Sequence, residues 1–365
     1  MKIAVFKETR PSETRVALTP TVAQQYIKQG HEVLIEAGAG LNSFFSDEAY
    51  TQAGAKVSSR AELAGADIFL KVNQPADDEI ALIPSGKVLV SYLYAAMNRQ
   101  LAEKIAAKGI SCFAMDAIPR ISRAQNMDAL SSQSNLAGYK AVIMGADAMG
   151  KIFPLLMTAA GTVTPSRVLI FGVGVAGLQA IATAKRLGAI VEATDVRPET
   201  KEQVESLGGK FITVEGADAV KTEGGYAKEV SEDYLRRQKE TILKHISQAD
   251  LVITTALVMG RKAPVLITEE MVKAMKFGSV IVDMAVEQGG NCELSELDKT
   301  VTKHGVKIVG QSNIPALLPQ NASDLYAKNI YNLLTHLATK DGMKWEMDEE
   351  ITAGTLVTHE GRLLK

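Results

Sequence analysis

The sequence contains few of the residues that mark disulfide-bonded, metal-binding or membrane-spanning proteins. Its two cysteines, Cys112 and Cys292, lie far apart in 365 residues, which indicates a reducing compartment. The five histidines are scattered without metal-ligand spacing, so we expect no metal site. No apolar run approaches the length of a bilayer crossing, and the amino terminus lacks the apolar core of a signal peptide. A net charge of −2 without a basic block argues against a nucleic-acid partner.

Length and periodicity predict an α/β protein of two domains. Apolar residues make up 46% of the chain and charged residues 22%, as is ordinary for a soluble globular enzyme. Strand-like runs alternate with helix-like segments, which predicts parallel sheets covered by helices. Predicted strands are 2–6, 32–35, 68–72, 87–93, 110–115, 168–171, 190–194, 211–214, 251–255, 280–283 and 306–309. Predicted helices are 21–29, preceded by Pro20, and 47–53, 98–107, 134–149, 178–187, 231–247 and 324–337.

The order of these segments predicts that the chain leaves its first domain and returns to it. We expect a discontinuous first domain, 1–133 plus 312–365, and a Rossmann domain at 134–311, with two parallel sheets flanking a cleft. Residues 158–165 read as a small-residue loop, and 341–365 as short strands or a hairpin. Residues 215–228 show no clear periodicity, and a loop of that length is usually functional or mobile.

A glycine motif between two predicted elements is the strongest functional signal. The run 167–171 is an apolar strand, Gly172, Gly174 and Gly177 form G-x-G-x-x-G, and a helical pattern follows. In this context the glycines permit a tight turn, close approach of a pyrophosphate, and close helix–strand packing. The helix N-terminus offers free N–H groups to the phosphates. Asp195 ends the next strand, where a carboxylate bonds ribose hydroxyls and favours NAD(H) over NADP(H). Arg197, two residues on, could soften that choice.

Several motifs together resemble a known family. The segment 119–132, with sequence PRISRAQNMDALSS, is the most specific. Segments 172–185, 200–209, 225–228, 285–287 and 289–292 also match. Over nearly its full length the chain resembles the NAD(H)-binding domain, the soluble component of the alpha subunit, of the proton-translocating NAD(P) transhydrogenases. It also looks like a relative of alanine dehydrogenase.

The resemblance implies roles for residues of the segment 119–132. It implies that Arg120 pairs with Asp128 and bonds the nicotinamide carboxamide, and that Gln125 bonds the nicotinamide ribose. Asp128 and Ser131 bond the carboxamide or that ribose. These are positioning roles, because a hydride passes directly between two rings and needs orientation rather than a base. The segment could instead be a polar surface loop with a local ion pair.

The resemblance also implies the remaining contacts of NAD(H), the cofactor we expect. Tyr226 belongs to a loop that closes over the bound nucleotide, and Leu257 lies over the adenosine or its ribose. The cofactor-binding residues expected from the motif and the resemblance are Gly172, Gly174, Val175, Ala176, Gly177, Asp195, Val196, Arg197, Gly225, Tyr226, Gln238 and Leu257.

Alanine dehydrogenase is the alternative function. That family uses an Arg, a Lys, a His and an Asp at its substrate. Arg15 and Lys71 match the first two, but Tyr94 and Glu287 stand at the His and Asp positions. A phenol titrates near pH 10 and is a poor acid–base group near neutrality, where imidazole is suited. We therefore expect Arg15 and Lys71 to serve structure or ion pairing.

The function that follows is the NAD(H)-binding component of a proton-translocating transhydrogenase. The expected partners are an NADP(H)-binding domain and a membrane domain on other chains, and the resemblance implies a homodimer. We expect the chain in the cytoplasm, peripheral on the inner face of the bacterial membrane. A regulatory nucleotide-binding subunit without turnover is a further class, against which the intact segment 120–131 argues.

Overall fold

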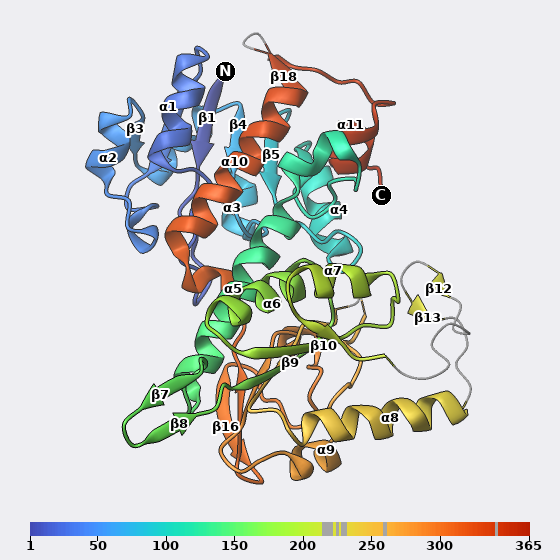
Figure 1. The fold of residues 1–365 in the computed structure, drawn as a ribbon. Coiled ribbons are helices and arrows are strands. Elements are labelled where there is room, and N and C mark those ends of the chain that lie inside the picture. The colour runs from blue at the N-terminus through green and yellow to red at the C-terminus, as the bar shows by residue number, and fades with distance from the viewer. Residues whose placement is uncertain (214–221, 224–225, 228–231, 258–260, 340–341) are drawn as a thin grey trace. The chain divides into compact units, whose positions relative to one another are not determined.

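The computed structural model describes residues 1–213, 222–223, 226–227, 232–257, 261–339 and 342–365 (Figure 1). The chain splits into two compact units, Met1–Gln133 with Pro315–Lys365, and Ser134–Ile314. We call them the first and the second domain. Each is built on its own mainly parallel sheet with helices on both faces, so the predicted α/β class is confirmed. No helix within the described ranges has both the length and the apolarity to cross a membrane.

The sheet of the first domain runs β3-β2-β1-β4-β5-β6-β20-β21. Strands β1 to β6 are parallel, and the C-terminal hairpin adds β20 antiparallel to β6. The strands are β1 (Lys2–Val5), β2 (Glu32–Glu36), β3 (Lys56–Ser58), β4 (Ile68–Leu70), β5 (Val88–Ser91), β6 (Ser111–Ala114), β20 (Leu356–His359) and β21 (Arg362–Leu363). The order 3-2-1-4-5-6 of the parallel strands is that of a doubly wound fold.

Alternating side chains of these strands build two core layers. Ile3 and Val5 of β1 face one layer, and Ala4 faces the other. Helices α1 and α10 contribute to the first layer, and α3 and α4 to the second. The helices are α1 (Pro20–Lys28), α2 (Asp47–Gln52), α3 (Asp77–Leu82), α4 (Arg99–Ala107), α10 (Pro319–Leu337) and α11 (Glu350–Thr355), with short 3-10 turns η1 (Leu41–Ser43), η2 (Arg60–Gly65), η3 (Ser122–Met127) and η6 (Ile314–Leu317). A small hairpin pairs β18 (Ala338–Thr339) with β19 (Gly342–Met343).

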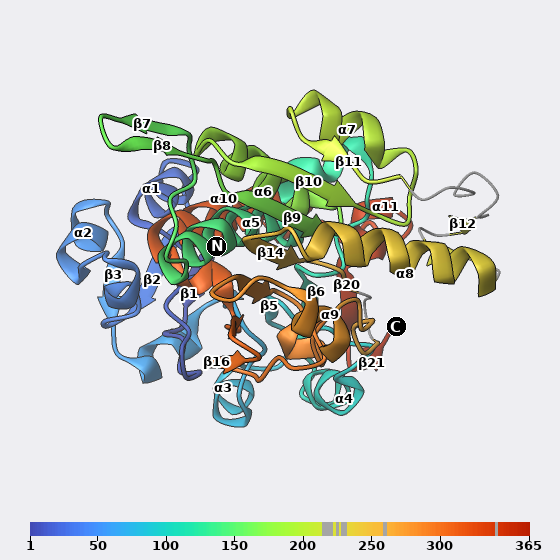
Figure 2. The same ribbon diagram turned by 60° about the horizontal axis from the view of Figure 1, so that its bottom comes forward.

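The sheet of the second domain runs β11-β10-β9-β14-β15-β17-β16, and all neighbours are parallel except β16 on β17 (Figure 2). The strands are β9 (Arg167–Phe171), β10 (Ile190–Thr194), β11 (Lys210–Phe211), β14 (Leu251–Thr254), β15 (Val280–Asp283), β16 (Lys299–Lys303) and β17 (Val306–Gly310). Phe171 is level with Thr194 of β10 and Thr254 of β14, so these three strands end together. The strand order reverses at β9, where α/β sheets bind ligands at the carboxyl ends.

Helices cover both faces of this second sheet. Val168 and Ile170 of β9 pack with α6, whereas Leu169 and Phe171 pack with α8 and α9. The helices are α5 (Ala129–Ala148), which begins in the first domain, α6 (Val175–Arg186), α7 (Thr200–Ser206), α8 (Glu232–Ile246) and α9 (Glu269–Ala274), with the turn η5 (Val286–Gln288). The short strands β12 (Thr222–Glu223) and β13 (Tyr226–Ala227) pair antiparallel.

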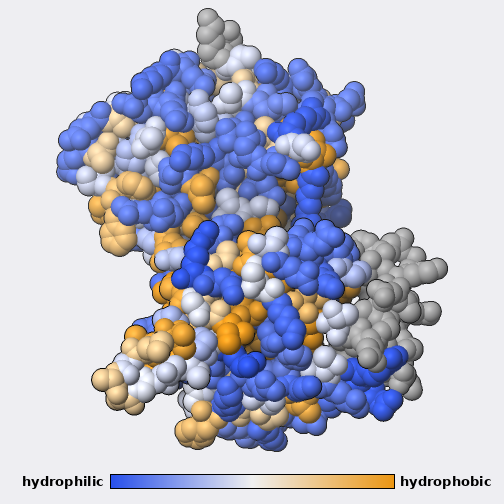
Figure 3. Space-filling view, viewed as in Figure 1, coloured by the Kyte–Doolittle hydropathy of each residue, from blue (hydrophilic) through white to orange (hydrophobic). Residues whose placement is uncertain are grey.

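One local prediction was wrong. Residues expected to form a small-residue loop belong to a hairpin, β7 (Leu156–Thr158) paired with β8 (Gly161–Val163). Gly161 has a φ of +133°, which lets the two-residue turn reverse the chain, and the small side chains hid this pairing. Leu156 and Met157 are exposed on the hairpin, and its surface is partly apolar (Figure 3).

Candidate functional site

The glycine motif forms the turn between β9 and α6. Gly172 has a φ of +91°, a conformation that side chains disfavour. A Cβ on Gly177 would lie 1.9 Å from the carbonyl oxygen of Gly172, so helix and strand approach each other only because both residues are glycine. Gly174 differs, because it has an ordinary φ of −82° and a Cβ there would meet nothing within 4 Å. The space over Gly174 is therefore not needed for packing and is open to a ligand.

The first turn of α6 fits an anion. Gly174 is the N-cap and has no side chain to accept the N–H groups of that turn. Val175 is exposed, and no acidic residue lies in the first turn. Free N–H groups and the positive end of the helix dipole attract phosphate. A dinucleotide pyrophosphate fits the residues present at this turn.

Asp195 connects the end of β10 to the glycine turn. One carboxylate oxygen accepts the Val173 N–H at 2.7 Å and Arg197 Nη2 at 3.0 Å. The other accepts the backbone N–H and the Nε of Arg197, both at 2.9 Å. Burial raises the pKa of Asp195, but these hydrogen bonds outweigh it and hold the pKa below its usual value. The carboxylate is therefore ionised, close to the turn, and covered by a guanidinium, a cover that sequence reasoning did not foresee.

Residues that were not singled out in the sequence also support this turn. The Thr255 hydroxyl, just beyond β14, lies 3.2 Å and 3.0 Å from the carbonyl oxygens of Phe171 and Gly172, within donating distance of both. Asn291 donates to the carbonyls of Ala256 and Pro264 and accepts the Ala256 N–H. Asn291 lies in the matching segment 289–292, so the sequence contained a signal for it, whereas Thr255 had none. Leu257 follows directly and is half exposed.

The structure does not describe every expected cofactor residue. Gly225 lies outside the described residues, as does most of the segment 215–228. Tyr226 belongs to β13 and Gln238 to α8. Val196 is half exposed between Asp195 and Arg197.

The loop expected to place the nicotinamide belongs to the first domain and ends at α5. Ala124 and Met127 are buried and anchor η3, while Arg120 and Gln125 are exposed. Asp128 accepts the Ser131 N–H at 2.9 Å and the Ser131 hydroxyl at 2.6 Å, as a capping residue does at the start of a helix. The implied ion pair of Arg120 with Asp128 is absent among the described residues, because Asp128 caps α5 instead. Two exposed polar side chains thus stand on a firmly anchored turn.

Arg15 and Lys71 are both committed to buried ion pairs. Arg15 forms two hydrogen bonds of 2.8 Å to Glu13 and one of 3.0 Å to Gln133. Lys71 lies 2.8 Å from Glu79 and 3.5 Å from Glu8. Despite burial, the bonds from Arg15 lower the pKa of Glu13 to about 2, whereas burial raises the pKa of Glu8. The expected structural role of both cations is confirmed.

The other two positions of an amino-acid site also lack the required chemistry. Tyr94 has a φ of +49° and stacks on Tyr92 with 5.7 Å between ring centroids. Asp116 accepts the N–H groups of Leu93 and Tyr94 and holds this bend. Glu287 is exposed in the second domain. Among the described residues no cluster of His, Cys, Asp and Glu could hold a metal ion.

These features define a two-domain α/β protein with a dinucleotide-binding turn, and comparisons give its family. The models of the alanine dehydrogenase/PNT N-terminal and C-terminal domains match residues 4–137 and 141–365. The chain belongs to this family, and the resemblance seen in the sequence is confirmed. It is 54% identical to the first of the alpha-subunit chains of NAD(P) transhydrogenase from Rhodospirillum rubrum, covering 100% of this chain and 98% of that protein.

Two further relatives mark the two branches of the family. The crystal structure of transhydrogenase from Sinorhizobium meliloti superposes with a TM-score of 0.91 at 44% identity and full coverage of both chains. Alanine dehydrogenase of Bacillus subtilis is 32% identical, over 100% of this chain and 92% of that enzyme. Identity is thus higher to these transhydrogenases than to this alanine dehydrogenase.

Proposed function

We propose that this chain is the NAD(H)-binding component of a proton-translocating transhydrogenase. It exchanges a hydride with NADP(H) held by a partner domain, and a separate membrane domain couples the exchange to proton movement. The observation that carries the proposal is that the dinucleotide turn is complete while Arg15 and Lys71 are consumed by Glu13 and Glu79. A nucleotide site without an amino-acid site fits a hydride carrier. The names of the relatives that share 54% and 44% identity support the same branch.

Each end of NAD(H) has its own residues in this proposal. The turn Gly172–Gly177 holds the pyrophosphate, and Asp195 with Arg197 meets the adenosine ribose. Arg120, Gln125, Asp128 and Ser131 position the nicotinamide, while Tyr226, Gln238, Gly225 and Leu257 contribute further contacts. NAD(H) supplies the hydride chemistry, and the chain's residues orient the ring and exclude water.

A single nucleotide site per chain makes a partner necessary. In the first domain β1 is followed by the glycine-free segment 6–19, and α1 begins only at Pro20. After β2, the glycines Gly38 and Gly40 lead into the short turn η1 rather than a long helix. Direct transfer requires the two nicotinamide rings to lie about 3–3.5 Å apart. The second ring must therefore come from another protein, which we place with this chain at the cytoplasmic face of the membrane.

The decisive experiment combines this chain with an isolated NADP(H)-binding domain of a transhydrogenase. Hydride transfer from NADH to an NADP analogue is followed with each component alone and with both, in the absence of membrane. We expect transfer only in the mixture. Comparable transfer by the chain alone would contradict the proposal, and analytical ultracentrifugation of the same sample would test the proposed homodimer.

A further inference from the structure

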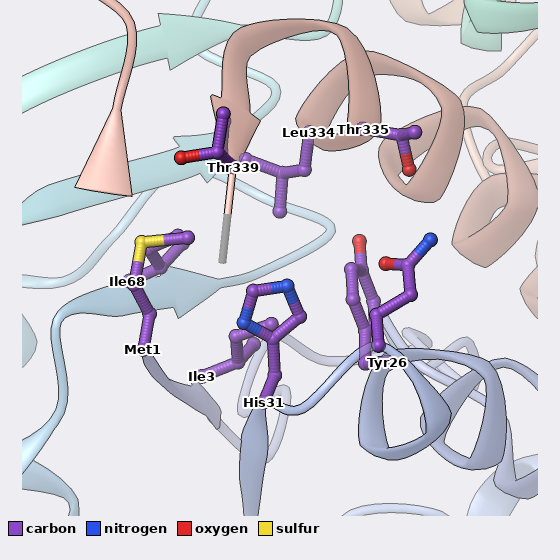
Figure 4. A pocket seen from close by; sticks show the side chains of 10 residues that line it. Met1, Ile3, Tyr26, His31, Ile68, Leu334, Thr335 and Thr339 are labelled. Carbon is purple, nitrogen blue, oxygen red and sulfur yellow. The ribbon is translucent and has the colours of Figure 1, made fainter. Parts of the chain in front are cut away.

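A hollow of about 200 Å³ lies in the first domain at the amino ends of β1, β2 and β4 (Figure 4). Buried Ile3, Ile68 and Leu334 form its apolar floor, with exposed fractions of 1%, 1% and 3%. Tyr26 of α1 and His31, just before β2, line it from one side, below the end of α10. Nucleotides bind at the carboxyl ends of such sheets, so this hollow is at the opposite edge.

Two polar atoms of the hollow have no hydrogen-bond partner among the described residues. They are the hydroxyl of Tyr26, whose side chain is 2% exposed, and Nδ1 of His31. Other buried tyrosines of the domain are satisfied, since Tyr50 donates to the Leu18 carbonyl at 2.6 Å and Tyr326 to the Lys71 carbonyl at 2.9 Å. Leaving a buried polar atom unpaired costs free energy, so such atoms call for an explanation.

The chemistry of the lining is neutral and aromatic. Asp, Glu, Lys and Arg are absent from the described residues that line the hollow. Burial, and to a smaller degree the nearby amino terminus, lowers the pKa of His31, which favours neutral imidazole with one donor and one acceptor nitrogen. The ring of Tyr26 meets those of Tyr331 and His31 edge-on, with centroids 5.0 Å and 6.0 Å away. Aromatic edges beside unpaired polar atoms suit a planar ligand.

We propose that this hollow binds a neutral heteroaromatic molecule of one or two fused rings, hydrogen-bonded by the Tyr26 hydroxyl and His31 Nδ1. An apolar cavity of about 150 Å³ accommodates benzene, so the larger hollow has room for a fused pair of rings. The donor and the acceptor of the ligand satisfy the two unpaired atoms, and its ring covers the floor of Ile3, Ile68 and Leu334. This binding goes beyond the proposed hydride transfer and does not depend on it.

The test measures binding of two ring-matched probes by isothermal titration calorimetry at about pH 8, where imidazole is neutral. Benzimidazole carries one donor and one acceptor, and indene carries neither. We expect benzimidazole to bind at least fivefold more tightly than indene. Tyr26→Phe keeps the ring and should weaken benzimidazole binding about fivefold to tenfold, the value of one neutral hydrogen bond.

His31→Phe is the second variant and should weaken benzimidazole binding similarly, so the proposal stays testable if one variant does not fold. Tyr139→Phe makes the same chemical change on an exposed tyrosine of the other domain and should leave binding unchanged. The proposal is overturned if benzimidazole does not bind, if indene binds equally well, or if the folded Tyr26 and His31 variants bind as the parent does. NADH is absent from every titration, so none of these outcomes bears on the transhydrogenase proposal.

Discussion

The guanidinium of Arg197 donates two hydrogen bonds, of 2.9 Å and 3.0 Å, to the carboxylate of Asp195, two residues before it. The pair occupies the acceptor sites that ribose hydroxyls would use. The Asp195 side chain is 6% exposed and that of Arg197 is 34% exposed, so Arg197 is the member free to leave toward solvent. Choice between the two dinucleotides thus depends on what replaces Arg197 at Asp195.

The parent protein should bind NADH more tightly than NADPH, because the Asp195 carboxylate repels a 2′-phosphate. Arg197→Ala removes the competing donors, so NADH affinity should rise about threefold to tenfold, one modest charged hydrogen bond, while NADPH affinity falls. Titrations followed by cofactor fluorescence measure both. Equal affinities of the parent for the two nucleotides would reject the role of Asp195 and make Arg197 dominant.

Gly174 and Gly177 should respond oppositely to alanine. Gly174→Ala meets nothing in the protein, so the free energy of unfolding should change by less than about 1 kcal/mol, while NADH affinity falls at least tenfold because the methyl group displaces the pyrophosphate. Gly177→Ala places a methyl group against the Gly172 carbonyl and should lower the free energy of unfolding by about 1–3 kcal/mol. Urea denaturation by circular dichroism and NADH titration separate the two effects. Unchanged NADH binding by Gly174→Ala would contradict the placement of the pyrophosphate.

Arg120→Ala and Gln125→Asn should slow hydride transfer far more than they weaken NADH binding. Both side chains are exposed on an anchored turn, so the variants should fold normally, and a misplaced ring can cost on the order of a hundredfold in rate. Stopped-flow transfer with the NADP(H)-binding domain, compared with the NADH dissociation constant, measures the two effects. Lost affinity with normal transfer at saturation would mean that the loop holds the cofactor rather than aiming it.

The parent protein should show no alanine dehydrogenase activity, and Tyr94→His should not create it. An imidazole at residue 94 still faces cations that are bound by Glu13 and Glu79, so a substrate carboxylate finds no free partner. The assay is NADH consumption with pyruvate and ammonia, with the Bacillus subtilis enzyme as positive control. Robust consumption by the parent protein would overturn the proposed function.

Glu349 should make the stability of the first domain depend on acid pH. It caps α11 through the N–H groups of Ile351 and Thr352 and contacts His336, and these contacts outweigh burial and lower its pKa to about 2. A lowered pKa stabilises the fold above the ordinary value of 4.5, and this contribution is lost as the pH falls toward about 2. Glu349→Gln should therefore cost about 1 kcal/mol at neutral pH and progressively less below pH 4.5.

The single tryptophan, Trp345, lies close to Glu349 in sequence and belongs to the first domain, so its fluorescence reports this unfolding. Urea titrations at neutral and acid pH, with Glu350→Gln as the matched control, give the difference. A cost that stays constant with pH would show that the Glu349 charge is not the stabilising element.

The sequence predicted the regions of this protein that depend on local periodicity. The unit from β9 through α6 to β10 follows from apolar runs and glycines, and Pro20 begins α1 as expected. Elements of two to six residues, such as β3, α3, α9 and the hairpin of β7 and β8, are too short to show a period. Long-range partners were also invisible, because the contacts of Arg197 with Asp195 and of Thr255 with Gly172 depend on strand order. The roles of Arg120, Gln125 and the other nicotinamide residues stay predictions.

The pairing of β20 with β6 has a consequence for the newly made chain. Leu356 lies opposite Phe113, and Thr358 opposite Cys112, so the first sheet is completed by residues that leave the ribosome after the whole second domain. Residues 134–314 emerge earlier and as one uninterrupted stretch. The second domain can therefore finish folding during translation, while β6 waits with an open edge. A chain cut before residue 356 would leave that edge exposed to pairing with other chains.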